Sequence, residues 1–216
     1  EAGLDDPENA KLPPMEDLQA AAQHMNIDDL ILDEAAQTVY FADPEMKLDV
    51  GAVAKGYATE IVSQMLLAGD MPSFIISAGG NVRMGNPPAD GRTKWGVGIQ
   101  DPDGAVLGLS DIVETLYVTS CSVVTSGDYQ RYYVVDGKRY HHIIDPDTLW
   151  PAAYYNGVTV LCPDSGMADC LTTALFCMPL EEGQKLVESL DGVEAMWCTP
   201  DKQAATSSGW DSHLKK

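Results

Sequence analysis

Apolar residues recur at helical spacing between Gly51 and Leu67. This spacing predicts a helix that Gly69 ends, and Asp49 stands just before it in a position typical of an N-cap residue. Similar patterns predict three further helices, at Met15–Met25 directly after two prolines, at Ser165–Cys177 and at Glu181–Leu190. The apolar positions of the first helix are Val53, Ala54, Tyr57, Ala58, Ile61, Val62, Met65 and Leu66.

Runs of β-branched and aromatic residues around polar turns predict two hairpins. Leu30–Phe41 divides into two such runs at a polar turn, Glu34–Gln37. Asp136 and Gly137 form an Asp-Gly pair between Arg131–Asp136 and Lys138–Ile144, which is the strongest local hairpin signal in the chain.

The remaining strand-like runs are short and apolar. Phe74–Ser77 stops at Gly79 and Gly80, which is typical of a buried strand that leads into a tight backbone turn. Because strands outnumber helices and are joined mostly by hairpins, the sequence predicts an α+β fold with a largely antiparallel sheet and packed helices. The other expected strands are Trp95–Gln100, Thr115–Thr119, Val123–Thr125, Val158–Leu161 and Val193–Cys198.

The sequence predicts a single domain, since it contains neither an internal repeat nor a low-complexity linker. We place this domain at residues 30–200, after an N-terminal arm and lead-in helix at 1–29 and before a C-terminal tail at 201–216. The longest apolar stretches, such as Ile61–Ala68, are much shorter than the roughly 20 residues of a membrane-spanning helix. We therefore expect no transmembrane segment in this chain.

The chain is strongly acidic, with 33 Asp and Glu against 13 Lys and Arg, so the formal net charge is -20 over 216 residues. This charge repels nucleic-acid phosphates and anionic membranes, which excludes nonspecific nucleic-acid binding as the role of the whole chain. The cysteines are odd in number, lie in apolar segments and lack C-x-x-C spacing. We interpret them as buried small hydrophobic residues rather than disulfides or zinc ligands. They are Cys121, Cys162, Cys170, Cys177 and Cys198.

Three polar patches, far apart in the sequence, could carry chemistry. The first runs from Asp49 to Tyr57 and combines glycines at a helix start with Lys55. Main-chain N–H groups and a lysine in such a position could bind a phosphate. Equally, Asp49 could only cap the helix while Lys55 is simply solvated.

The second patch comprises Thr125–Arg131 and the hairpin end at His141–Thr148. Hydroxyls, a glycine, an arginine and two histidines on one hairpin could hold an anionic ligand and transfer a proton. Adjacent residues of a strand point to opposite faces, so at most one of His141 and His142 should face a ligand. The alternative is an exposed strand end with a hydrogen-bonded histidine.

The third patch lies in the predicted helix at Ser165–Cys177. Asp169 and Thr173 are four residues apart, which puts a carboxylate and a hydroxyl on the same helix face. Such a pair of hard oxygen donors suits Mg²⁺ or Ca²⁺. A buried aspartate near a helix start could instead be a structural cap, and the spacing alone leaves both interpretations open.

Taken together and in order, these patches resemble the ApbE family, the FAD:protein FMN transferases, also called flavin transferases. Any one block would be weak evidence, but six blocks in the family's order make a specific resemblance. The family pattern is D-x-G-x-x-A-K-G-Y, G-G-[DN], W-x-V-G-I-x-D-P, T-S-G-D-Y-x-R-Y, H-H-I-x-D-P-x-T-G-x-P and A-D-x-L-x-T-A-L. The matching residues are 49–57, 77–81, 95–102, 125–132, 141–151 and 168–175.

The resemblance implies a Mg²⁺-dependent transfer of the FMN portion of FAD to a threonine hydroxyl of an acceptor flavoprotein, with release of AMP. FAD is then the substrate, Mg²⁺ the cofactor, and the target threonine lies in a short D-[GA]-x-T-[SG]-A-T type motif. Two alternatives stay open. Water in place of the threonine would make the protein an FAD pyrophosphatase that gives FMN and AMP, and loss of turnover would leave a non-catalytic FAD-binding protein.

The resemblance also implies residue roles. The metal ligands are expected to be Asp169, Thr173 and the main chain at Ala52. His142 is the expected proton-handling residue, with Asp145 as second choice. Contacts with FAD are expected from Lys55, Tyr57, Gly79, Gly80, Asn81, Thr125, Ser126 and Gly127, while Tyr129 and Arg131 either contact FAD or brace the hairpin.

Two features depart from the family pattern. Leu149 stands where the family has glycine, so the local backbone should differ if that glycine needs a positive φ. Family members also carry a long N-terminal stretch, whereas 48 residues precede Asp49 here, and we expect a fragment, a processed form or a natural short variant. Because the family is typically exported in bacteria, the resemblance implies an extracytoplasmic, membrane-anchored lipoprotein as the full-length form.

Overall fold

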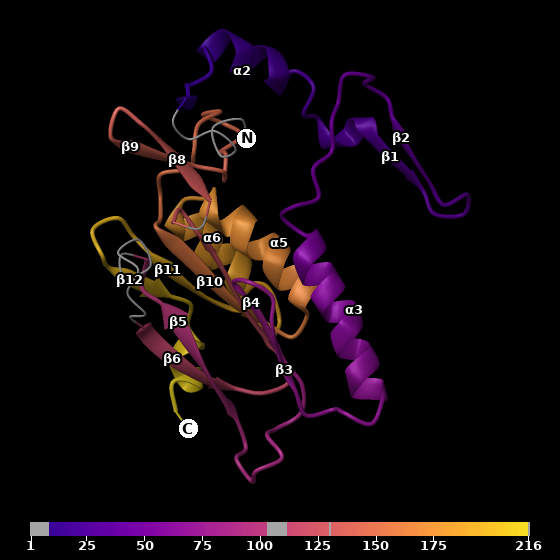
Figure 1. Cartoon of the computed structure of the whole chain (residues 1–216), viewed down its shortest axis with the longest axis vertical. Helices are drawn as coiled ribbons and strands as arrows, with labels where there is room; N and C mark the ends of the chain where they lie inside the picture. Colours follow the sequence, from indigo (N-terminus) through magenta and orange to yellow (C-terminus); the bar gives the residue numbers. More distant parts are fainter. Residues whose placement is uncertain (1–8, 103–111, 130, 216) are drawn as a thin grey trace.

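The computed structural model describes residues 9–102, 112–129 and 131–215 (Figure 1). Its centre is a six-stranded sheet in which each strand is antiparallel to its neighbours. The predicted α+β class with a largely antiparallel sheet is thereby confirmed. In sheet order the strands are β12 (Ala204–Thr206), β11 (Glu194–Cys198), β10 (Gly157–Cys162), β7 (Ser122–Gly127), β4 (Asn81–Met84) and β3 (Ile75–Ser77).

Each face of this sheet is covered by its own core. Neighbouring residues of a strand point to opposite faces, so Val124 of β7 packs in one core and Val123 in the other. The core around Val124 includes Phe176 and Val187 from the helices, and the core around Val123 includes Leu116 from a two-stranded ribbon. The helices are α5 (Ser165–Phe176) and α6 (Leu180–Glu188), and the ribbon strands are β5 (Trp95–Gln100) and β6 (Ile112–Val118).

Helix α3 (Ala54–Ala68), which carries Lys55 and Tyr57 of the first polar patch, packs beside α5 on the helical face of the sheet (Figure 1). Two small hairpins, helix α2 and two short 3-10 helices are the remaining elements of the described residues. In Figure 1 α2 and the β1–β2 hairpin stand away from the sheet, at the end where α3 begins. These elements are α2 (Met15–Ala22), η2 (Ile27–Asp29), β1 (Leu30–Asp33), β2 (Thr38–Phe41), β8 (Tyr132–Val135), β9 (Lys138–His141) and η3 (Trp210–His213).

The start of α3 differs from the prediction. The helix begins at Ala54, and its N-cap is Val53, whose apolar side chain cannot accept a hydrogen bond. Asp49 instead accepts the N–H of Gly51 at 2.6 Å within the preceding turn. The prediction that Asp49 caps this helix is therefore wrong, and an aspartate from elsewhere takes that role, as shown below.

Other boundaries also differ. The first helix ends at Ala22 rather than Met25. Strand β3 lies at the edge of the sheet and Ile75 is 45 % exposed, so the prediction of a buried strand there is wrong. The short strands β4 and β12 were not predicted. None of the helices in the described ranges has both the length and the apolar character that crossing a bilayer requires.

The cysteines and Leu149 require two further corrections. All five cysteines fall within the described residues and are free thiols, but Cys170 is exposed on α5, contrary to the prediction that all are buried. Leu149 has a φ of 62°, so the backbone adopts the left-handed conformation that a glycine would favour, and the expected change of backbone is not found. The turn is closed by the Leu149 N–H, which donates to the Asp145 carbonyl at 2.8 Å.

Candidate active site

The carboxylate of Asp169 on α5 is bound by the first turn of α3. Its Oδ1 lies 2.8 Å from Nζ of Lys55, and its Oδ2 accepts the main-chain N–H of Gly56 at 2.7 Å. The Asp169 side chain is 6 % exposed and that of Lys55 37 %. Since Val53 offers no acceptor, Asp169 satisfies an N–H that the start of α3 leaves unpaired and places negative charge at the positive end of the helix dipole.

Contacts of Lys55 and of Asp164 decide two of the alternatives that the sequence left open. Lys55 is not simply solvated, because its ammonium pairs with Asp169. Asp169 is not the cap of its own helix either, because Asp164 holds that position and accepts the N–H of Met167 at 2.7 Å. Asp169 caps α3 through the Gly56 N–H, and its carboxylate lies beside the Lys55 ammonium.

Two glycines explain how α3 and α5 approach so closely. A Cβ at Gly56 would lie 2.4 Å from the Ser165 carbonyl oxygen and 2.5 Å from Cβ of Asp169. A Cβ at Gly166 would lie 3.4 Å from Cα of Tyr57. Any side chain at position 56 would therefore push the helices apart and separate Lys55 from Asp169.

The predicted metal ligands lie around this helix contact. Thr173 is half-buried one turn after Asp169, with its Oγ1 3.5 Å from the Asp169 carbonyl oxygen, and Ala52 is exposed in the turn before α3. A carboxylate, a hydroxyl and a main-chain carbonyl are all hard oxygen donors, and Asp169 already stabilises one positive charge, that of Lys55. These are donor types that Mg²⁺ accepts, and in this structure Lys55 and the Gly56 N–H occupy the two carboxylate oxygens of Asp169.

In the described part of the chain, no group of three or more His, Cys, Asp and Glu side chains is arranged to hold a metal ion. Of the predicted metal ligands, only Asp169 is one of these four side-chain types. The other two are the Thr173 hydroxyl and the Ala52 main-chain carbonyl.

The predicted FAD-binding glycines lie against the T-S-G block. Gly79 and Gly80 have φ of 57° and 83°, which glycine adopts without strain, and they form the turn between β3 and β4. The Gly80 carbonyl accepts the N–H of Thr125 at 2.8 Å. Two blocks that are distant in the sequence therefore meet at this point.

The hydroxyls of the T-S-G block connect β7 to α5. Ser126 Oγ donates to Thr172 Oγ1 at 2.9 Å, and Thr172 Oγ1 donates to the Asp169 carbonyl at 2.8 Å. Thr125 Oγ1 lies 2.9 Å from Oγ1 of Thr159 on the neighbouring strand. Gly127 is needed because a Cβ there would lie 2.3 Å from the ring of Tyr129.

The remaining two predicted FAD contacts have contrasting environments. Asn81 is fully buried, and its Oδ1 accepts a hydrogen bond from Ser165 Oγ at 2.8 Å. Tyr57 is 65 % exposed on α3. Asn81 therefore faces the protein interior, whereas Tyr57 is available at the surface.

The two histidines lie on opposite faces, as predicted. His141 is buried, with its Nε2 2.9 Å from the Ala152 carbonyl oxygen and its ring packed edge-on against Phe176. His142 is exposed, and its Nδ1 lies 3.1 Å from the Arg131 carbonyl oxygen. A carbonyl oxygen can only accept, so Nδ1 of His142 carries the ring proton and Nε2 keeps its lone pair.

The charge state of His142 suits a proton acceptor. Surrounding protein atoms desolvate the ring although the residue reaches the surface, and this burial lowers the pKa of His142 below its ordinary value of 6.5. The hydrogen bond to the Arg131 carbonyl raises the pKa by less, and the Arg131 charge lowers it further. The imidazole is therefore neutral at pH 7.

Asp145 and the histidines lie toward the far end of α5 from Asp169. Asp145 is buried, and its Oδ1 accepts the N–H of Asp147 at 2.9 Å. The adjacent Ile144 carbonyl lies 3.7 Å from Sγ of Cys177, which follows α5. Cys177 is eight residues after Asp169, about 12 Å along a helix axis. A ligand that contacts both Asp169 and the Asp145–histidine group must therefore extend along α5.

Sequence reasoning missed one buried ion pair. Nε of Arg83 on β4 lies 3.0 Å from Oε2 of Glu60 on α3, and their side chains are 4 % and 12 % exposed. The available signals were an arginine between Val82 and Met84 in a strand, and a glutamate one turn after Gly56.

The protein is thus an α+β domain in which a six-stranded antiparallel sheet has helices on one face and a two-stranded ribbon on the other, with Lys55 and Asp169 in contact where α3 begins. The family model described as the ApbE family matches residues 2–197 of this sequence. The chain therefore belongs to the ApbE family.

Individual relatives agree with this assignment. The chain is 39% identical over 183 residues to the FAD:protein FMN transferase of Treponema pallidum, a match that covers 81% of this chain and 50% of the relative. It is 33% identical over 198 residues to an FAD:protein FMN transferase of Klebsiella pneumoniae, which covers 91% of this chain and 60% of that protein. The chain thus spans little more than half the length of these curated relatives.

Solved structures share the fold. A crystal structure of the ApbE protein from Thermotoga maritima superposes with a TM-score of 0.86 at 33% identity, covering 97% of this chain and 66% of that chain. The flavin transferase ApbE from Vibrio cholerae gives a TM-score of 0.78 at 28% identity, covering 94% and 64%.

Proposed function

We propose that this chain carries the catalytic centre of an FAD:protein FMN transferase, which moves the FMN portion of FAD onto a threonine hydroxyl of an acceptor flavoprotein and releases AMP. The observation that carries the proposal is the contact of Lys55 and Gly56 with Asp169, which joins the first and last of the six blocks. The names of the relatives in Treponema and Klebsiella support FAD as the substrate.

The proposed reaction is a substitution at phosphorus. The acceptor hydroxyl oxygen forms a bond to the phosphorus of the FMN half, and the bond from that phosphorus to the bridging oxygen breaks. AMP leaves with the bridging oxygen, and the hydroxyl proton passes to a base. Such a reaction needs positive charge around the pyrophosphate, a positioned nucleophile and a proton acceptor.

The α3–α5 contact supplies the groups for the pyrophosphate. Asp169, Thr173 and the Ala52 main chain would hold Mg²⁺, which when bound would neutralise charge on the phosphate oxygens. Lys55 adds a second positive charge beside Asp169, and the helix dipole of α3 favours anions near its N-terminus.

His142 is the proposed proton acceptor. Its neutral ring keeps a lone pair on Nε2, because Nδ1 donates to the Arg131 carbonyl. Asp145 is the second candidate, but its carboxylate is buried and already accepts the N–H of Asp147. These contacts favour His142.

The test uses a synthetic acceptor peptide with the D-[GA]-x-T-[SG]-A-T type motif, FAD and MgCl₂. Covalent flavin on the peptide, detected by fluorescence and mass spectrometry, together with AMP, supports the transferase. A matched peptide with the threonine replaced by valine should remain unlabelled. AMP without labelled peptide would instead indicate an FAD pyrophosphatase, and FAD binding without AMP would indicate a non-catalytic FAD-binding protein.

A further inference from the structure

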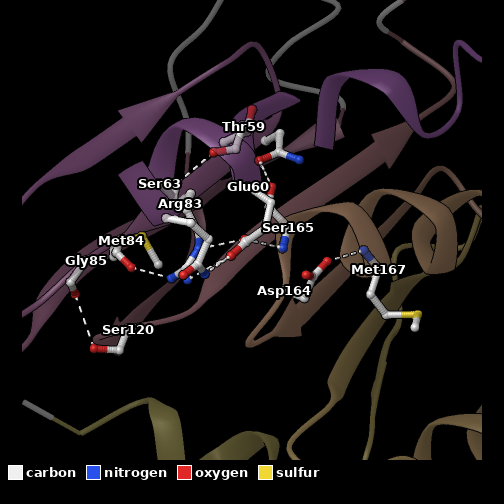
Figure 2. A network of polar contacts seen from close by, with 12 residues as sticks. Thr59, Glu60, Ser63, Arg83, Met84, Gly85, Ser120, Asp164, Ser165 and Met167 are labelled. Atoms are coloured by element: carbon white, nitrogen blue, oxygen red, sulfur yellow. Dashed lines mark hydrogen bonds and ion pairs between the residues drawn. The ribbon is translucent and has the colours of Figure 1, made fainter. Parts of the chain in front are cut away.

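One helical turn beyond the Lys55–Asp169 contact, a buried polar network ties α3 to β4 and α5 (Figure 2). Glu60 is its centre. Oε2 of Glu60 accepts from Nε of Arg83 at 3.0 Å and from the main-chain N–H of Ser165 at 2.8 Å. Its Oε1 accepts from Nε2 of Gln64 at 2.5 Å. The proposed chemistry uses none of these groups.

Both members of the ion pair are charged and buried. Arg83 is 3 % exposed, and its Nη1 donates to the Met84 carbonyl at 2.5 Å (Figure 2). Burial alone would raise the pKa of Glu60, but hydrogen bonds from Arg83, Ser165 and Gln64 together hold this pKa below its ordinary value of 4.5. The pair therefore stays ionised at neutral pH and cannot touch a ligand in solvent.

Ser165, the first residue of α5, is the point where three elements meet. Its N–H donates to Glu60 on α3, and its Oγ donates to Oδ1 of Asn81 on β4 at 2.8 Å. Its carbonyl oxygen faces Gly56, where a Cβ would lie 2.4 Å away. Asp169 follows one helical turn later on the same helix. Ser165 and Asp169 therefore both contact α3 from the first part of α5.

We propose that Glu60 and Arg83 are positioning residues that fix the first turn of α5 against α3 and so hold Asp169 and Thr173 in place relative to Lys55 and Ala52. The catalytic consequence rests on the proposed function. The pair acts through Ser165, because Glu60 supplies the acceptor for its N–H and Arg83 orients the Glu60 carboxylate.

A purely stabilising role makes different predictions from a positioning role. Buried ion pairs can often be replaced by apolar residues of similar size without loss of stability, whereas removal of one partner leaves an uncompensated buried charge. The double variant Glu60→Leu/Arg83→Met should therefore remain folded but lack an acceptor for Ser165. The single variant Glu60→Gln should be less stable but keep a side-chain oxygen for the Ser165 N–H.

The experiment compares these two variants with the parent and with a control, Asp90→Asn/Arg92→Met, which removes an exposed ion pair with a 2.7 Å contact. Four quantities are measured: thermal midpoint, amide hydrogen exchange at the start of α5, Mn²⁺ affinity by calorimetry, and kcat and KM for AMP release from FAD. Mn²⁺ serves as the probe for the magnesium site.

If Glu60 and Arg83 position α5, Mn²⁺ affinity falls in the double variant, whereas thermal stability falls in Glu60→Gln. The double variant should stay folded with a thermal midpoint no lower than that of Glu60→Gln, exchange faster at the start of α5, and lose about tenfold in Mn²⁺ affinity and in kcat while the KM for FAD stays within about threefold. Glu60→Gln should melt earlier but bind Mn²⁺ as the parent does. The control should match the parent throughout.

The opposite pattern overturns the proposal. If the double variant has the parent's exchange rates, Mn²⁺ affinity and kcat, or if Mn²⁺ affinity simply follows thermal stability in both variants, the pair is structural only. If the double variant does not fold, parent-like exchange and Mn²⁺ affinity in Glu60→Gln support the proposal, and their loss contradicts it. A parent that neither binds Mn²⁺ nor releases AMP overturns the proposed function, while exchange at the start of α5 still decides the positioning claim.

Discussion

Nζ of Lys55 lies 2.8 Å from Oδ1 of Asp169, although 114 residues separate them in the sequence. The contact places the first turn of α3 against the first half of α5, and Gly56 makes it possible because any side chain there would collide with the main chain of Ser165. A lysine, a buried carboxylate and the N-terminus of a helix are thereby assembled at one point, on which the proposed function rests.

Replacement of Lys55 by methionine tests the charge in this contact. Lys55→Met keeps most of the length of the side chain and removes its positive charge. Since the proposed function has Lys55 neutralise phosphate charge, we expect kcat for AMP release to fall about 10–100-fold. Lys47→Met, at an exposed position before α3, is the matched control and should behave as the parent. Steady-state kinetics with equal activity in both variants would contradict the role of Lys55.

Gly56→Ala tests the helix contact through the sign of a stability change. Helix propensity alone would make this substitution stabilising by about 1 kcal/mol. Because the new Cβ would lie 2.4 Å from the Ser165 carbonyl oxygen, we expect destabilisation of about 1–3 kcal/mol instead. Urea unfolding measures the difference. Gly96→Ala, where a Cβ meets its nearest atom at 3.5 Å, should change stability much less, and a more stable Gly56→Ala variant would refute the close contact.

The pH dependence of AMP release tests His142. Burial lowers the pKa of His142 below 6.5, so the ring accepts protons at pH 7 and becomes charged only as the pH falls below 6.5. The rate should therefore be constant near neutral pH and decrease on the acid side. His142→Gln should lower the rate about 100-fold or more and abolish the acid limb. His213→Gln is the control, and an acid limb that survives in His142→Gln would assign it to another group.

Leu149→Gly tests the left-handed turn. A leucine at a φ of 62° is strained by about 1–2 kcal/mol, while glycine costs about 0.4–1 kcal/mol through the greater freedom of the unfolded chain. We expect the variant to be more stable than the parent by up to about 1 kcal/mol. Thermal unfolding is the measurement, and a clear loss of stability would show that packing of the Leu149 side chain outweighs the backbone strain.

The regular elements could be predicted because each carries a local signal. The periodicity around Tyr57 and Ile61 is that of α3, and the Asp136-Gly137 pair lies in the turn of the β8–β9 hairpin. Strand β4 was missed because Asn81 and Arg83 point inward, against the usual pattern of polar residues outside. Their partners, Ser165 and Glu60, are distant in the sequence, so no local pattern could reveal them.

The residues of the candidate site could be predicted better than their contacts. The spacing of Asp169 and Thr173 identified one helix face, and the order of the blocks pointed to Lys55 and the glycine turn. That Asp169 caps α3, and that Asn81 is buried against Ser165, depends on how two helices and a strand pack together. Such packing is a long-range property that spacing along the chain does not encode.

The most direct test is Mg²⁺-dependent AMP release from FAD in the presence of the acceptor peptide, measured by chromatography for the parent and for Asp169→Asn, with the exposed Glu181→Gln as control. We expect AMP from the parent only when Mg²⁺ is present, the same from Glu181→Gln, and at least about 100-fold less from Asp169→Asn. Equal AMP release by Asp169→Asn, or release by the parent that does not depend on Mg²⁺, would contradict the proposed function.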